Sequence, residues 1–95
     1  MEIDGTLDLH GHTRNSAHAA LIRFVERAQE KSARILLVIT GKGSMENGER
    51  GVLRRELPHW LELHPLKEAV LSHPPARPEH GGSGALYLIL RRKKK

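Results

Sequence analysis

The chain of 95 residues is long enough for one domain with a single modest core. No apolar run approaches the roughly 18 residues that a membrane-spanning helix needs, so we expect no membrane segment. The absence of cysteine excludes disulfides and thiolate metal sites. It also suits the reducing cytoplasm, which is where we expect the protein to reside.

The formal net charge of +5 comes from the end of the chain. Five of the 16 Lys and Arg residues occupy positions 91–95, which leaves 11 basic against 11 acidic residues in positions 1–90. We therefore expect a neutral domain over residues 1–90, followed by a basic tail over residues 91–95. Such a tail either attracts phosphates without specificity or is a solvated terminus, and its charge does not locate a binding site on the domain.

The first part of the chain predicts a strand, a helix and a second strand. A short strand covers Gly5–His10, and Thr13 is suited to begin the helix as its N-cap. The helix shows apolar residues at three- and four-residue spacing: Ala17, Ala20, Leu21, Phe24, Val25 and Ala28. The continuous apolar run Ile35–Ile39 then predicts a strand buried on both faces. Together these elements predict a right-handed βαβ unit with parallel strands.

A second helical pattern follows a polar loop that contains the turn signal Asn47-Gly48. Its apolar positions are Leu53, Leu57, Trp60 and Leu61. Pro58 lies inside this pattern, and because proline lacks an N–H group we expect a helix over about 51–57 and a new turn that begins at Pro58. At this spacing Trp60 is predicted to be a core residue and not a platform for stacking bases.

The last part of the chain predicts two further strands. Residues Leu66–Ser72 are strand-like, His73–Ser83 is rich in proline and glycine and is expected to be a loop, and Gly84–Leu90 is the last strand. The element order is therefore βαβαββ. It predicts an α/β fold in which helices pack on a four-stranded mixed sheet.

The segment Leu7–Gly11 places two chemically competent side chains together. Because successive strand residues point to opposite faces, Leu7 and Leu9 enter the core while Asp8 and His10 share the other face, about 7 Å apart. A carboxylate beside an imidazole is one arrangement of a reaction centre. Strand alternation alone explains the pair equally well.

Three glycine-containing turns accompany this pair, at His10–His12, Thr40–Gly43 and His80–Gly84. The first two follow parallel strands, and ligands of open α/β sheets bind at the carboxyl ends of such strands, so we expect these turns to be neighbours. Glycine lets a phosphate approach backbone N–H groups, and Lys42 adds a positive charge. The spacing is not that of a P-loop, which disfavours nucleotide hydrolysis, and tight turns explain the glycines without any function.

The remaining histidines carry weaker signals. His10 and His12 lack the helical spacing of metal-binding histidine pairs. We expect the scattered histidines to be surface residues: His18, His59, His64 and His73.

Taken together, these motifs resemble the Smr (small MutS-related) domain family over about Leu7–Leu90. The marks of the family are an LDLHG motif, a TGKG motif, a Leu-Arg pair that opens the second helix, and a GG-x-GA strand. In this sequence they stand at Leu7–Gly11, Thr40–Gly43, Leu53-Arg54 and Gly81–Ala85. The resemblance implies a two-layer βαβαββ sandwich similar to the carboxy-terminal domain of a bacterial translation initiation factor. It also implies binding of DNA or RNA and, as in several members, endonuclease activity.

The sequence departs from the family at one cap position. Many members have Glu where this chain has Ser16, so we expect the reciprocal capping box with Thr13 to be lost. Many Smr domains also lie at the end of larger proteins that deliver them to a substrate.

The leading hypothesis is phosphodiester cleavage. His10 would act as general acid or base, and Asp8 would orient His10, stabilise its charge, or hold a divalent cation such as magnesium. The further predicted contacts to phosphate are Gly11, Thr40, Gly41, Lys42, Gly43, Arg54, His80, Gly81 and Gly82. His80 is alternatively a second proton carrier. Water or a ribose 2′-hydroxyl would attack, and the latter would restrict cleavage to RNA and need no metal.

Two alternatives remain at this stage. In the first, the same surface binds DNA or RNA and catalyses nothing. In the second, the domain docks onto a larger nucleic-acid-processing machine through protein contacts. The residues alone do not separate these alternatives from cleavage.

Overall fold

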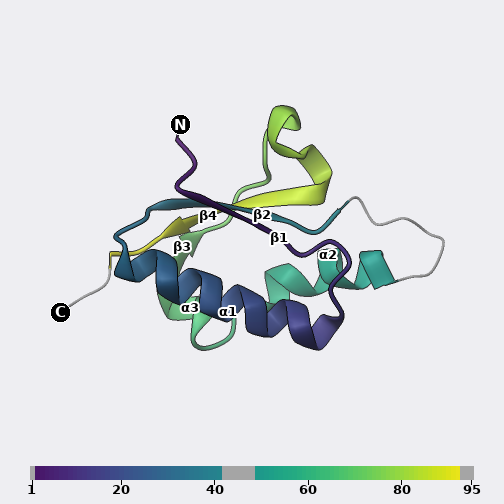
Figure 1. Ribbon diagram of the computed structural model, residues 1–95, viewed down its shortest axis with the longest axis horizontal. Coiled ribbons are helices and arrows are strands. Elements are labelled where there is room, and N and C mark those ends of the chain that lie inside the picture. The colour runs from purple at the N-terminus through teal and green to yellow at the C-terminus, as the bar shows by residue number, and fades with distance from the viewer. Residues whose placement is uncertain (1, 42–48, 93–95) are drawn as a thin grey trace.

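The computed structural model describes residues 2–41 and 49–92. Lys42, Gly43 and the predicted Asn47-Gly48 turn lie outside the described residues. The elements in chain order are β1 (Gly5–Asp8), α1 (Arg14–Glu30), β2 (Ile35–Ile39), α2 (Glu49–Trp60), α3 (Leu66–Ala69), β3 (Val70–Ser72), the 3₁₀ turns η1 (Pro78–His80) and η2 (Gly82–Gly84), and β4 (Ala85–Leu90). The α-helices all cover one face of the sheet (Figure 1).

The sheet has the predicted mixed topology. Its four strands lie in the order β1-β2-β4-β3. β1 and β2 are parallel, with Asp8 opposite Ile39, whereas β4 is antiparallel to both β2 and β3. The predicted βαβ unit and the two-layer α/β fold are therefore confirmed.

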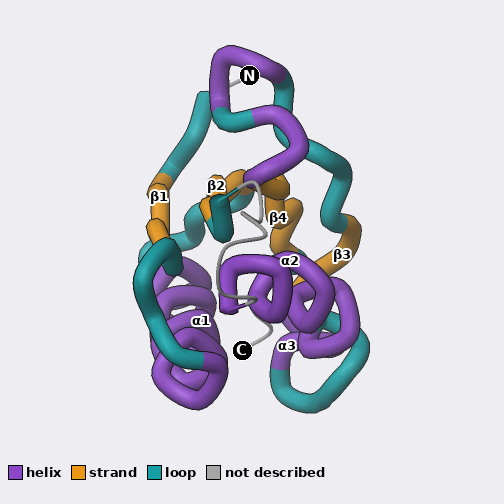
Figure 2. The backbone as a smooth tube through the Cα atoms, turned by 90° about the vertical axis from the view of Figure 1, so that its right-hand side faces the viewer, coloured by secondary structure: helices purple, strands orange, loops and turns teal. Residues whose placement is uncertain are grey.

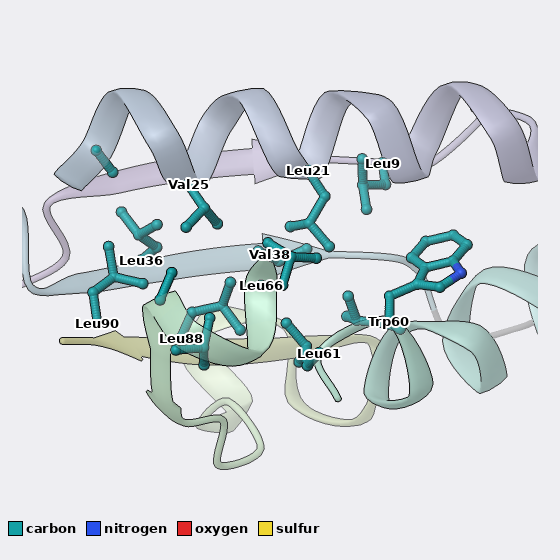
Figure 3. Packing of buried hydrophobic residues seen from close by; sticks show 14 of the residues in the cluster. Leu9, Leu21, Val25, Leu36, Val38, Trp60, Leu61, Leu66, Leu88 and Leu90 are labelled. Carbon is teal, nitrogen blue, oxygen red and sulfur yellow. The ribbon is translucent and has the colours of Figure 1, made fainter. Parts of the chain in front are cut away.

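The main core fills the space between the sheet and the helices (Figure 3). Its fully buried large side chains are Leu9, Leu21, Val25, Leu36, Val38, Leu57, Leu66, Leu88 and Leu90. Trp60 belongs to the same cluster with 4% of its surface exposed, which confirms that it is a core residue. The periodic apolar faces identified in the sequence are the faces that meet here.

A smaller cluster covers the opposite face of the sheet. It contains the buried residues Leu37, Ala76, Ala85 and Tyr87. The segment between β3 and β4 supplies the cover, because η1 and η2 lie on the side of the sheet away from the α-helices (Figure 2). Backbone hydrogen bonds fasten it, with the Tyr87 N–H donating to the Pro74 carbonyl at 2.9 Å. The predicted loop 73–83 thus contains two ordered 3₁₀ turns.

The predicted helix break at Pro58 is wrong, since α2 continues to Trp60. Pro58 lies in the last turn, where its missing N–H removes a single bond to the carbonyl four residues earlier. Helical bonding resumes immediately, with the Leu61 N–H donating to the Leu57 carbonyl at 3.1 Å. Leu57, Trp60 and Leu61 are all buried, so their packing holds the helical course.

The predicted strand Leu66–Ser72 is wrong in its first half. Leu66–Ala69 form the short helix α3, and only Val70–Ser72 pair as β3. Leu66 and Ala69 are both buried although they stand three residues apart. A strand would point them to opposite faces, whereas a helical turn points both at the core.

The capping box at the start of α1 is present, contrary to expectation. The Thr13 hydroxyl oxygen accepts from the Ser16 N–H at 3.2 Å, and the Ser16 hydroxyl oxygen accepts from the Thr13 N–H at 3.1 Å. Serine therefore closes the reciprocal pair that glutamate closes in other sequences.

His18 is not the simple surface residue that was predicted. Its ring stacks on Trp60, with centroids 4.7 Å apart and planes 9° from parallel. Its Nε2 atom is buried and has no hydrogen-bond partner within the described part of the chain. His59 and His64 are exposed as predicted, whereas His73 is half-buried.

Candidate functional site

The first motif forms a turn at the end of β1. The predicted strand extends to His10, but β1 ends at Asp8, where a carboxylate oxygen accepts from the backbone N–H of His10 at 2.8 Å. Gly11 then takes the left-handed φ of +87°. Leu9 is fully buried and donates its N–H to the Ile39 carbonyl at 2.7 Å. Asp8 and His10 are therefore coupled through the backbone, on a turn that Leu9 anchors.

The second motif begins with Thr40, which is 3% exposed and follows β2 directly. The N–H groups of Thr40 and Gly41 both donate to the Gly84 carbonyl, at 2.9 and 3.1 Å. The Thr40 hydroxyl lies 3.1 Å from the Gly41 carbonyl and 3.4 Å from the Gly84 carbonyl. These bonds join the second motif to the third.

The first and second motifs also lie against each other. A Cβ atom built on Gly41 would lie 4.0 Å from Cδ2 of His10, so the imidazole approaches the Gly41 backbone closely. Gly41 has a φ of +86°. The expectation that the two turns are neighbours is confirmed, and the backbone bonds to Gly84 connect the third motif to them.

The sheet register decides which face Asp8 points to. Asp8 stands opposite Ile39, and Ile39 stands opposite Ala85. Opposite residues in neighbouring strands point to the same face, so Asp8 shares the face that carries η1 and η2. Two strand spacings of about 4.8 Å put β1 about 10 Å from β4. The exposed Asp8 carboxylate thus lies on the same side of the sheet as the loop of the third motif.

His80 of the third motif has a partner that the sequence did not reveal. Its Nδ1 lies 2.6 Å from the hydroxyl oxygen of Tyr87, which also accepts from the Arg77 N–H at 3.1 Å. The two rings meet edge to face. Tyr87 is the single tyrosine of the sequence and stands on β4, so its isolation in an apolar strand was the one available signal.

The glycines of the third motif use their N–H groups inside the loop. Gly81 donates to the Pro78 carbonyl at 3.2 Å, and Gly82 donates to the Arg77 carbonyl at 3.0 Å. Both have positive φ, +115° and +52°. These glycines shape the loop, and their contact with phosphate stays a prediction.

Arg54 and Thr40 line a common pocket between α2 and the start of β4. Arg54 is exposed and is the sixth residue of α2, so the Leu53-Arg54 pair lies inside the helix and does not open it. The structure thus brings Arg54, one of the predicted phosphate contacts, next to Thr40 of the second motif. Lys42 and Gly43 are predicted contacts that lie outside the described residues.

Asp8 is the carboxylate that was considered for a metal ion. Among residues 2–41 and 49–92, no three His, Asp or Glu side chains gather as a metal site would require. Magnesium nevertheless commonly binds through one or two carboxylates, with water and substrate phosphate as the other ligands. An exposed carboxylate such as that of Asp8 fits this mode as a single protein ligand.

Comparison with known proteins identifies the family. The Smr domain model matches residues 7–91. The chain belongs to the Smr domain family. The Smr domain of Thermus thermophilus MutS2 superposes on this Smr domain with a TM-score of 0.77 and 28% identity, covering 92% of this chain and 98% of that one. Escherichia coli YdaL, a stand-alone small MutS-related protein, gives a TM-score of 0.81 and 29% identity over 92% of this chain and 64% of that one.

Curated relatives are longer than this Smr domain. It is 30% identical over 87 residues to a ribosome rescue factor SmrB of Shewanella putrefaciens, covering 92% of this chain and 44% of that protein. It is 33% identical to an uncharacterised protein of Treponema pallidum, covering 94% of this chain and 42% of that protein. The Smr domain thus spans less than half the length of these relatives. None of its described helices is long and apolar enough to cross a membrane.

Proposed function

We propose that this Smr domain binds DNA or RNA at the carboxyl ends of β1 and β2 and cleaves a phosphodiester bond there. The observation that carries the proposal is the approach of the exposed His10 ring to Gly41, whose turn is itself fastened to Gly84. His10 is exposed, and an imidazole is the side chain that most often serves as general acid or base. An open surface suits a polymer backbone better than a small metabolite.

In this proposal His10 transfers the proton and Asp8 is a positioning residue. The Asp8 carboxylate bonds to the His10 amide, so it fixes the turn that carries the imidazole. Asparagine at position 8 keeps an acceptor oxygen for that amide but removes the charge. Asp8→Asn therefore preserves cleavage if positioning is the whole role, and it abolishes cleavage if charge or a bound cation is needed. A magnesium ion, when bound, would polarise a phosphoryl oxygen.

Phosphate binding falls mainly to cationic side chains. The Thr40 and Gly41 N–H groups donate to Gly84 and are occupied inside the protein. Among the other predicted contacts, Lys42 and Arg54 carry a positive charge, whereas Gly11 and Gly43 would contact phosphate through the backbone. We also propose that residues 91–95 attract phosphate without specificity, and their deletion should lower affinity mostly at low salt.

Binding without catalysis is the second candidate. One observation favours it: the Asp8 carboxylate serves the backbone of its own turn, a structural role that requires no chemistry. One relative is named a ribosome rescue factor. A domain that binds nucleic acid as part of a larger assembly is compatible with that name.

The test incubates the purified chain with labelled single-stranded RNA, supercoiled plasmid and branched DNA, in magnesium and in EDTA. His10→Ala should slow cleavage by about 10²–10⁴-fold, the usual contribution of a general acid or base, while affinity stays within about twofold. His64→Ala is the matched control, since His64 is exposed and pairs with Glu68. Cleavage that survives His10→Ala refutes the proposed reaction. Binding without cleavage of any substrate establishes the second candidate.

A further inference from the structure

A pocket of about 300 Å³ adjoins the turn of the second motif. Its walls are largely apolar: Leu57 and Pro58 come from α2, Pro75 from the segment between β3 and β4, and Leu86 from the start of β4. Thr40, Arg54 and Ala85 complete the lining, so the pocket lies directly beside the second motif. The volume stands at the lower end of the range of about 300–1,000 Å³ for small-ligand pockets. It has room for one planar ring system, whereas a base-paired duplex is too large.

The walls of this pocket are already ordered before a ligand binds. Pro75 stands opposite Leu86 in an isolated antiparallel bridge, which sets the distance between these two walls. Pro58 and Pro75 lose no side-chain rotamer freedom when they cover a ligand. Flat apolar surfaces of this kind suit the face of an aromatic ring. The exposed Arg54 adds a guanidinium plane that is able to stack on a base or contact its phosphate.

We infer that this pocket takes one unpaired nucleobase from a strand whose backbone passes beside the second motif. The inference rests on the proposed function, because it assumes that nucleic acid is the ligand. A base is joined to its own phosphate through a single sugar. Thr40 both lines the pocket and begins the second motif, so a base in the pocket leaves its phosphate beside that motif. The pocket therefore selects single-stranded or unpaired substrates over duplex, as proteins that splay bases out do. Its low polarity predicts little sequence preference.

The experiment measures fluorescence anisotropy with labelled strands of about 12 nucleotides. One strand carries its bases, a second is abasic with the same phosphates, and a third is the duplex. The chain should bind the base-containing single strand about tenfold more tightly than the other two. Leu86→Trp fills the pocket, so its affinity for the base-containing strand should fall about tenfold while its affinity for the abasic strand stays the same. Leu71→Trp is the matched control, because Leu71 is 52% exposed and lies on β3 away from the pocket.

Pro58→Ala provides a second variant, which should leave the fold intact. Alanine favours the interior of α2 and removes only one wall, so a loss of about threefold for the base-containing strand is expected. Equal binding of base-containing and abasic strands by the unmodified chain overturns the inference but leaves the proposed function standing. Tenfold discrimination that persists in Leu86→Trp also overturns it. Failure to bind any of the three strands overturns the proposed function itself, and the inference with it.

Discussion

The loop of the third motif depends on a glycine at position 81, where Gly81→Ala should be costly for two separable reasons. Gly81 has a φ of +115°, which L side chains rarely adopt, and such backbone strain costs about 1–3 kcal/mol. The added Cβ atom would also lie 2.9 Å from the Cβ atom of Ala85. This neighbour is fixed on β4 and cannot swing away, so overpacking adds about 1–3 kcal/mol. We expect a total loss in the free energy of unfolding of about 2–6 kcal/mol.

Gly82→Ala separates the two contributions. Gly82 has a φ of +52° and nothing within 4 Å of an added Cβ atom, so only a conformational cost of about 1–2 kcal/mol is expected. Urea unfolding of both variants gives the difference directly. In a double-mutant cycle, Ala85→Gly removes the contacting atom, and the coupling with Gly81→Ala should be favourable by about 1–3 kcal/mol. Equal costs at positions 81 and 82, or strict additivity in the cycle, would refute the steric argument.

Three further predictions concern hydrogen bonds that fasten the turns and strand ends. Thr40→Val removes the hydroxyl hydrogen bond but leaves two amide N–H groups bonded to the Gly84 carbonyl. Urea unfolding should therefore show a loss of about 1 kcal/mol in the free energy of unfolding, and a loss above about 3 kcal/mol would contradict this reasoning. Ser16→Ala removes half of the capping box and should lower the free energy of unfolding by about 0.5–1 kcal/mol, which corresponds to a melting temperature lower by about 4 °C. An unchanged melting temperature would mean that the capping box does not stabilise the fold. The Asp4 carboxylate accepts the N–H groups of Ile35 and Arg34, which lowers the pKa of Asp4 below its ordinary value of 3.8. A lowered folded-state pKa gives stability that is present above pH 3.8 and is lost as the pH falls through the folded value. Asp4→Ala should therefore have a lower melting temperature than the unmodified chain at pH 7, and this difference should disappear in acid. A difference in melting temperature that is independent of pH would contradict this assignment.

Hydrophobic periodicity was sufficient to predict most of the architecture. The continuous run Ile35–Ile39 and the three- and four-residue spacing before it can be buried in few ways other than a βαβ unit. The parallel pairing in turn brings the ends of β1 and β2 to the same edge, so His10 and Gly41 had to be neighbours. The apolar residues that the sequence spaces periodically are the same residues that pack together in the core.

Local rules failed where tertiary packing outweighed them. Pro58 normally ends a helix, but in α2 the buried residues around it make continuation more favourable than a break. The segment Leu66–Ala69 is too short for its apolar pattern to distinguish a strand from one helical turn. At position 16 the family comparison suggested a lost cap, although a serine hydroxyl satisfies the same backbone N–H group.

Side-chain partners could not be derived from spacing at all. The bond between His80 and Tyr87 joins residues on a 3₁₀ turn and on β4, and it depends on how the loop folds over the sheet. The stacking of His18 on Trp60 likewise depends on the contact of α1 with α2. Each pairing requires the three-dimensional path of the chain, which periodicity does not specify.

The hydrogen bonds of the glycine turns leave few backbone N–H groups for binding phosphate. Glycines in such motifs suggest a cradle of N–H groups, but the N–H groups of Gly41, Gly81 and Gly82 all donate to carbonyls of the protein. A donor that is already bonded inside the protein offers little to a ligand, since binding would exchange one hydrogen bond for another. The conformational freedom of these glycines therefore serves to bring His10 and the third motif to one sheet edge. The proposed affinity for nucleic acid should then depend mostly on cationic side chains and weaken as salt rises.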